Sequence, residues 1–147
     1  HAVDLAYAVL EGVGFLNRIV LERAEAALGC KARELRFGGG ASANPLWCQI
    51  KADILGCPVV VGAAPEPGLL GAAMVAFTGL GRFASLGEAQ AALSRIAHRF
   101  EPDPARHAQY DRLYALFREA EAALAPISIA LAREVISPDD LVEIRDV

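Results

Sequence analysis

The sequence predicts an α/β fold with a parallel βαβ core that is packed with several helices. Residues 33–37 alternate polar and apolar side chains, which is typical of a strand with one buried face. Residues 58–61 form an uninterrupted apolar run, as expected of a strand that is buried on both faces. Between them, Leu46, Ile50 and Ile54 recur at helical spacing. Strand, helix and strand within about 30 residues indicate a parallel βαβ unit.

A long helix is expected over residues 2–28. Its apolar side chains recur at helical spacing, and Gly29 supplies a C-terminal stop. The recurring positions are Leu5, Val9, Leu16, Val20 and Ala27. Gly12 and Gly14 interrupt this pattern, and a glycine inside a helix costs about 1 kcal/mol relative to alanine. The pair therefore indicates that another backbone or a ligand comes close to the helix there.

Further helices are expected downstream. Residues 69–78 are rich in glycine and alanine, which would allow a close approach to the sheet. A capping box at Ser85 starts the next helix. The expected inner face of that helix consists of Ala89, Ala92, Leu93 and Ile96. Asp103 starts the last clear helix, which Pro126 is expected to end, and Ser137 resembles one more helix start.

Composition limits the function classes. The chain has 147 residues, which suits one ordinary domain, and its apolar fraction of 54% indicates large buried faces or a surface for a partner domain. A net charge of −4 and the lack of a basic cluster argue against nucleic-acid binding. No apolar run approaches the roughly 20 residues of a membrane span, and no signal peptide is recognisable. We therefore expect no membrane partner.

The cysteines indicate a reducing compartment. Cys30, Cys48 and Cys57 are odd in number and follow no repeated spacing, which favours reduced thiols in a cytoplasmic protein. Cys48 and Cys57 are expected to be small buried hydrophobic residues. The chain has no Cys-x-x-Cys and no histidine pair at helical spacing, so we expect no metal site formed by its own side chains.

Three consecutive glycines, Gly38, Gly39 and Gly40, join the first strand to the following helix. Glycine lets a bulky ligand approach the main chain, and helix N-termini offer unpaired N–H groups. A Walker loop is excluded, because Ala41, followed by Ser42, stands where the motif requires lysine. A dinucleotide-binding fingerprint fits this stretch, but it requires an acidic residue after the next strand, where none occurs. A dinucleotide-dependent oxidoreductase is therefore the least favoured class.

Several segments together resemble the C-terminal half of the FGGY carbohydrate kinases. The likeness extends in order from about Ala2 to Leu124, and the ordered set is more specific than any one segment. The matching segments are residues 9–15, 35–44, 47–59, 66–76 and 110–114. We therefore predict a kinase-like segment over residues 1–125 and a tail of unknown role over 126–147.

The resemblance implies part of an actin-like ATPase fold, built from two ribonuclease-H-like domains. It also implies transfer of the γ-phosphoryl group of Mg²⁺-ATP to a hydroxyl of a sugar or polyol. By position, Gly39, Gly40 and Ala41 would border the adenosine and the α-phosphate, and Asn44 would face the adenine edge. Simple helix capping is the alternative role for Asn44, and both roles are compatible if Ser42 shares the cap.

Other polar residues are expected to be structural. Gln49 and Asp53 lie four residues apart and are expected to form an exposed polar stripe. We expect His98 and His107 to be surface histidines and Asp103 to be a helix cap. Two more acidic residues, one in a turn and one on a helix surface, are also given no chemical role: Glu66 and Asp111.

Motifs that the family uses in catalysis are absent from this sequence. We find no Asp-x-Gly-Thr or Gly-Thr-Ser phosphate loop, and no residue is proposed as catalytic. We therefore expect a piece of a larger enzyme that has no kinase activity alone. Self-association, or association with an N-terminal domain, is expected. A non-catalytic actin-like binding or interaction module is the alternative function.

Overall fold

The computed structural model describes residues 1–135 of the chain. Its internal contacts divide between Tyr110 and Asp111, so residues 1–110 form one compact unit and a second unit begins at Asp111. All three strands and the predicted loop belong to the first unit. The division at residues 125 and 126 stays a prediction. None of the helices within residues 1–135 is long and apolar enough to cross a membrane.

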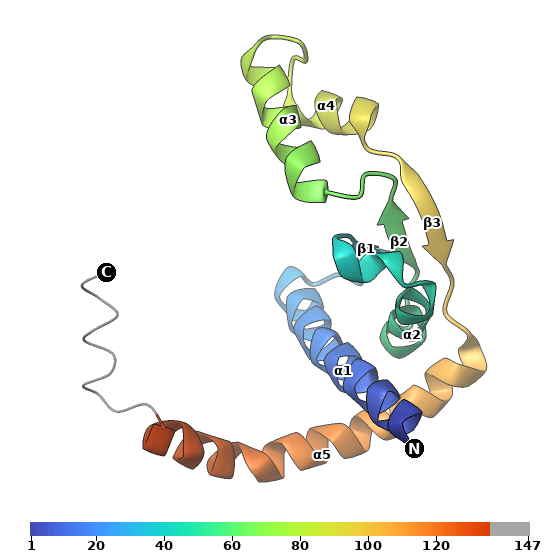
Figure 1. The fold of residues 1–147 in the computed structure, drawn as a ribbon, viewed down its shortest axis with the longest axis vertical. Coiled ribbons are helices and arrows are strands. Elements are labelled where there is room, and N and C mark those ends of the chain that lie inside the picture. Colours follow the sequence, from blue (N-terminus) through green and yellow to red (C-terminus); the bar gives the residue numbers. More distant parts are fainter. Residues whose placement is uncertain (136–147) are drawn as a thin grey trace. The chain divides into compact units, whose positions relative to one another are not determined.

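A small mixed sheet forms the centre of the first unit (Figure 1). It contains β1 (Leu35–Phe37), β2 (Val59–Gly62) and β3 (Ile96–Phe100), in the order β1-β2-β3. β1 pairs with β2 in parallel, which confirms the βαβ unit, and β3 pairs with β2 antiparallel. The helical placement of Ile96 is wrong, because the preceding helix ends at Leu93 and Ile96 begins β3.

Helix α2 (Pro45–Leu55) covers one face of this sheet and supplies much of the core. Asn44 is its N-cap, which confirms the capping role considered for it, and Gly56 ends the helix with a left-handed φ of 66°. The buried core cluster consists of Cys48, Ala52, Val59 and Val61, with Leu35, Phe37 and Phe100 packed against it. Cys57 is also buried, as predicted, and Cys30 is exposed.

Helix α1 (Ala2–Leu28) packs on α2, and Gly29 ends it as predicted. The two interrupting glycines differ in their surroundings. A Cβ at Gly14 would meet Cδ1 of Ile54 on α2, whereas a Cβ at Gly12 would meet nothing within 4 Å. The close approach predicted for this region therefore exists at Gly14, and the neighbour is a side chain of α2.

Helices α3 (Pro67–Gly79) and α4 (Leu86–Leu93) follow β2 and pack on each other. Ser85 caps α4 as predicted, with its hydroxyl 3.2 Å from the amide of Glu88. Ala89 is fully buried. The expected close approach of α3 to the sheet is wrong: no residue of α3 is buried, and its main neighbour is α4. The small side chains of α3 therefore leave apolar surface exposed.

Helix α5 (Pro104–Val135) starts in the first unit and continues through the described part of the second. Asp103 caps it as predicted, because its Oδ1 accepts from the amides of Ala105 at 2.9 Å and Arg106 at 3.0 Å. Pro126 lies inside the helix and does not end it. A proline removes one N–H donor and disturbs one turn, and here the helix resumes after it. The helix start expected at Ser137 lies outside the described residues.

Candidate nucleotide-binding site

The three loop glycines differ in what the described chain requires of them. A Cβ at Gly38 would lie 2.6 Å from Cγ of Pro67, at the start of α3. Gly39 has a φ of 85°, a conformation that residues with a Cβ rarely adopt. Gly40 has no positive φ, and a Cβ there would meet nothing within 4 Å. The described chain therefore has no steric need for glycine at position 40, and the bare backbone there leaves room for a ligand.

The loop continues as a short 3-10 turn, Gly40–Ala43, before α2 begins. The amide of Ser42 donates to the carbonyl of Gly39 at 2.9 Å, and the Ser42 hydroxyl donates to the same oxygen at 2.7 Å. Ser42 therefore stabilises the turn, and its hydroxyl is not part of the α2 cap. The N–H groups of Gly40 and Ala41 precede the first bond of the turn, where no acceptor within the helix exists.

Asn44 performs the capping role. Its Oδ1 accepts from the amides of Leu46 at 3.0 Å and Trp47 at 3.3 Å. Because these two amides are donors, the carbonyl oxygen of the side chain must face the helix and the NH₂ group points elsewhere. Any contact between Asn44 and an adenine edge would therefore use the amide as a donor only.

A hollow of about 530 Å³ lies between the glycine loop, the end of β2 and β3. Its volume is within the range of small-molecule sites, roughly 300–1,000 Å³. Gly39 and Gly40 line it, whereas Ala41 and Asn44 are not part of the lining. The other lining residues are Ser42, Ala43, Pro45, Val61, Gly62, Ala63, Ala64, Pro65, Glu66, Ala97, His98 and Phe100.

A second hollow, of about 390 Å³, adjoins the first at the end of β2, and both are lined by Gly62 and Ala64. Gly38 lines this second hollow, so the glycine loop borders both. The guanidinium-bearing residues Arg36 and Arg95 lie in its wall. Arg36 forms an ion pair with Glu34 at 3.4 Å. One hollow is therefore uncharged over most of its wall, and its neighbour carries two cationic side chains.

His98 and Phe100 were not expected to line a site, because the sequence did not predict the strand β3 to which they belong. Their rings lie 6.4 Å apart, and both residues belong to the edge strand that closes the first hollow. The sequence offers little signal for this strand, because residues 96–100 do not alternate polar and apolar side chains. His98 is exposed, as predicted.

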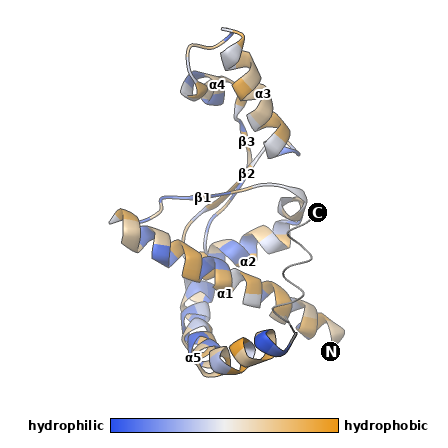
Figure 2. Ribbon diagram, turned by 90° about the vertical axis from the view of Figure 1, so that its left-hand side faces the viewer, coloured by the Kyte–Doolittle hydropathy of each residue, from blue (hydrophilic) through white to orange (hydrophobic). Residues whose placement is uncertain are grey.

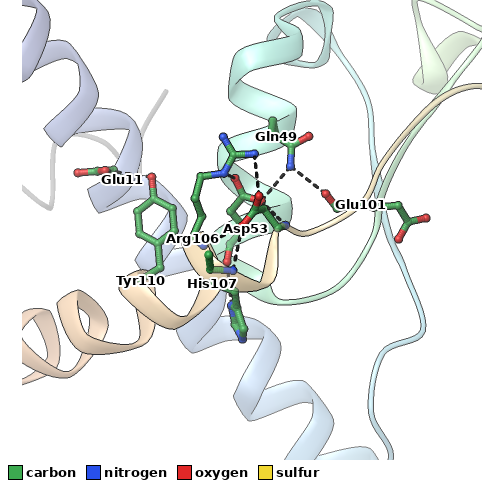
Figure 3. A network of polar contacts seen from close by, with 9 residues as sticks. Glu11, Gln49, Asp53, Glu101, Arg106, His107 and Tyr110 are labelled. Carbon is green, nitrogen blue, oxygen red and sulfur yellow. Dashed lines mark hydrogen bonds and ion pairs between the residues drawn. The ribbon is translucent and has the colours of Figure 1, made fainter.

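The prediction that Gln49 and Asp53 form an exposed stripe is wrong. Asp53 is only 1% exposed and is the centre of a polar network (Figure 3). Its Oδ1 accepts from Gln49 Nε2 at 2.8 Å, and its Oδ2 lies 2.9 Å from Nε of Arg106. His107 is half-buried, contrary to expectation, and its Nδ1 lies 2.8 Å from the Asp53 carbonyl oxygen. A single sequence could not show these contacts, because the partners lie about 50 residues apart.

Two buried titratable groups join helices in the first unit. Lys51 contacts Asn17 Oδ1, and burial lowers the pKa of its ammonium group from the ordinary value. The Tyr110 hydroxyl donates to Glu11 at 3.1 Å, and burial together with that hydrogen bond raises the pKa of the phenol. Both groups contact neighbouring helices, and neither residue lines the hollow beside the glycine loop.

Comparisons with known proteins agree with this arrangement. The family described as "FGGY family of carbohydrate kinases, C-terminal domain" matches residues 1–80. An FGGY carbohydrate kinase domain-containing protein from Homo sapiens is 36% identical over 113 residues, which cover 77% of this chain and 20% of that protein. A glycerol kinase from Dechloromonas aromatica is 39% identical over 120 residues, covering 82% of this chain and 23% of the relative.

Solved structures show the same likeness. A xylulose kinase from Rhodospirillum rubrum superimposes with a TM-score of 0.67 at 32% identity, covering 82% of this chain and 24% of that one. A ligand-bound xylulose kinase from Lactobacillus acidophilus gives a TM-score of 0.71 at 27% identity, with the same two coverages of 82% and 24%.

These likenesses define the class of protein: the chain contains part of an actin-like ATPase fold, as predicted. More particularly, the chain belongs to the FGGY family of carbohydrate kinases, which confirms the resemblance seen in its sequence. It spans only 20% to 24% of the length of these four relatives.

Proposed function

We propose that this chain is the nucleotide-side segment of a kinase that transfers the γ-phosphoryl group of ATP to a hydroxyl of a sugar or polyol. The observation that carries the proposal is the open space beside Gly40. This glycine borders a hollow of about 530 Å³, and nothing in the described chain occupies the place of its absent side chain. A purine nucleotide needs such a bare stretch of backbone to lie against the loop.

Charge supports the same assignment. The nucleoside would lie along the backbone of Gly39, Gly40 and Ala41, with the amide group of Asn44 as a donor to the base. The adjoining hollow offers Arg36 and Arg95, and guanidinium groups suit phosphate oxygens. Mg²⁺ would enter with the ATP phosphates, which commonly supply its ligands in such sites.

We assign binding surface to the described residues and assign none of them as the base for the attacking hydroxyl. Phosphoryl transfer depends on positioning and on charge stabilisation around the transferred group. We therefore expect the isolated 147-residue chain to show no sugar-dependent ATP turnover in a coupled assay. Turnover at rates typical of kinases, about 1–100 per second, would contradict this.

The free thiols of Cys30, Cys48 and Cys57 support a cytoplasmic setting for the enzyme.

Calorimetry with ATP and with NAD tests the binding assignment directly. We expect ATP to bind and NAD not to bind. A Gly40→Val variant of the natural full-length gene product should lose ATP binding while keeping its fold, because a side chain there has open space. Gly71→Val, at another glycine with open space, is the matched control and should bind ATP normally. Unchanged ATP affinity in Gly40→Val would remove the assignment.

A non-catalytic actin-like binding or interaction module is the second candidate. The observation in its favour is that the described residues offer binding groups and no catalytic base. The two functions differ in one measurement: the full-length gene product of a kinase turns over ATP when sugars or polyols are supplied, whereas a binding module binds ATP without turnover.

A further inference from the structure

The segment that joins β3 to α5 is fastened to α2 by side chains that the proposed nucleotide site does not use. Gln49 Nε2 donates to the carbonyl of Glu101 at 2.8 Å, and Asp53 Oδ1 accepts from the amide of Asp103 at 2.8 Å. Asp53 Oδ2 pairs with Nε of Arg106 at 2.9 Å (Figure 3). We refer to Gln49, Asp53 and Arg106, with the backbone groups they bind, as the Asp53 clamp.

Burial makes the geometry of this clamp demanding. The Asp53 side chain is 2% exposed, so water cannot satisfy its charge. A buried carboxylate is tolerated only when its oxygens are paired and hydrogen-bonded. Its three donors come from two segments: Gln49 belongs to α2, whereas the Asp103 amide and Arg106 follow β3. Both segments must therefore keep their places around Asp53.

The clamp joins the two elements whose other ends line the hollow, and its own residues do not line it. α2 begins at Pro45, which lines the hollow directly after the glycine loop. β3 ends at Phe100, next to the clamped carbonyl of Glu101, and both His98 and Phe100 line the hollow. The clamp therefore fixes the wall formed by β3 relative to the wall formed by the glycine loop and α2.

We infer that Asp53 is a positioning residue for nucleotide binding: through Gln49, the Asp103 amide and Arg106, it sets the distance between β3 and the glycine loop. This inference rests on the proposed function, because it assigns the hollow to the nucleotide. β3 stays paired with β2, so loosening the clamp shifts the Phe100 end of β3. The contact of the hollow with the nucleotide then weakens, while the acceptor hydroxyl, bound elsewhere, is unaffected.

The test uses Asp53→Asn and Arg106→Gln in the natural full-length gene product. Asp53→Asn keeps side-chain size, Arg106→Gln gives a shorter polar side chain, and both remove the pairing of charges in the clamp. We expect the KM for ATP and its calorimetric Kd to rise by roughly threefold to thirtyfold, the range of effects transmitted through neighbouring residues. The kcat and the KM for the sugar or polyol should stay unchanged. Arg118→Gln, on the same helix but paired with Glu121, is the matched control and should change neither constant.

A purely structural role gives a different result. Destabilisation alone lowers the fraction of folded enzyme, so the apparent kcat falls while the KM for ATP stays constant. That outcome would overturn the inference. If Asp53→Asn does not fold, Gln49→Leu removes the hydrogen bonds to Glu101 and to Asp53 Oδ1 but leaves the Asp53–Arg106 ion pair, and the same rise in the KM for ATP is expected from it. A wild-type protein that binds no ATP would refute the proposed function. If wild type binds ATP and these variants bind it with the same Kd, the positioning role is refuted and the proposed function is not.

Discussion

The ammonium group of Lys51 lies 4.3 Å from the centre of the Trp47 ring, one turn earlier on α2. The centre of the Phe37 ring, on β1, lies 4.7 Å from the same ammonium group, which also donates a hydrogen bond to Asn17 Oδ1. Lys51 is 4% exposed, so these aromatic faces and one amide oxygen replace most of the water around its charge. Burial outweighs this compensation, and the pKa of Lys51 is lowered.

The lowered pKa of Lys51 predicts how stability depends on pH. In the unfolded chain the amine titrates near its ordinary value of about 10.4, and in the folded chain it titrates at a lower pH. Below the folded pKa both states are charged, so the cost of burying the charge is complete. Between the two pKa values the folded state loses its proton first, so the contribution of Lys51 to the free energy of unfolding rises with pH.

Lys51→Met isolates this contribution. We expect the difference in free energy of unfolding between Lys51→Met and wild type to move in favour of wild type as the pH rises from 7 to 10. Urea titrations at several pH values measure it. Burial raises the pKa of the Cys57 thiol in both proteins, so its contribution cancels. The pKa of the Cys48 thiol is raised by burial and partly lowered again by the Lys51 charge, so Lys51→Met is compared with wild type in a Cys48→Ala background. A difference that stays constant with pH, or moves toward the variant, would contradict the assignment.

The cap of α2 gives a second prediction. Asn44→Ala removes the oxygen that accepts from two amides, and we expect a loss of about 1 kcal/mol in the free energy of unfolding. Asn44→Asp keeps an acceptor oxygen and should keep most of the stability. The same variant lacks the NH₂ group, so ATP affinity should fall if that group donates to the base. Equal ATP affinity in Asn44→Asp and wild type would leave capping as the role of Asn44.

Gly38 and Gly40 should respond differently to the same substitution. Gly38→Ala places a methyl group against the ring of Pro67, which cannot turn away, and overpacking of this kind costs about 1–3 kcal/mol. Gly40→Ala meets open space and should leave the free energy of unfolding nearly unchanged. Thermal and urea unfolding of both variants check this. A Gly40→Ala variant that is as unstable as Gly38→Ala would show that the space beside Gly40 is filled.

The parts of the fold that sequence predicts well are those set by local chemistry. Gly29 and Gly56 end their helices because each adopts a left-handed conformation, and Asn44 and Asp103 cap theirs through neighbouring amides. The apolar run at Val59 to Val61 predicted a strand buried on both faces, and all three residues are buried. Each of these features depends on contacts within a few residues, which a single sequence contains.

The parts that sequence could not predict depend on partners far along the chain. Asp53 and Gln49 fit the pattern of an exposed stripe until the segment near Asp103 covers them. β3 is a short edge strand whose paired residues on β2 lie 34 to 41 positions earlier, so helical spacing from Ala89 extended wrongly to Ile96. Pro126 predicted a helix end from local preference, but the helix continues through it.

The apolar surface of α1 gives the last prediction. Phe15 and Ile19 are buried, whereas a row on another side of the helix is exposed. The exposed row and its exposed fractions are Leu5 71%, Val9 60%, Val13 43%, Leu16 49% and Val20 65%. At 100° per residue these positions fall within about 80° of one another, so they form one stripe. Figure 2 shows the apolar colouring along α1 and again on α3, none of whose residues is buried.

Exposed apolar stripes drive association, so we expect the 147-residue chain to self-associate as its concentration rises. Static light scattering measures this. The double variant Val9→Glu and Leu16→Glu places charges in the middle of the stripe and should shift the chain toward monomer. Gln90→Glu, on exposed α4, adds negative charge outside the stripe and should self-associate like wild type. If wild type is monomeric at high concentration, the stripe does not bind a second copy. If the control dissociates as fully as the double variant, repulsion by net charge explains the effect and the stripe does not.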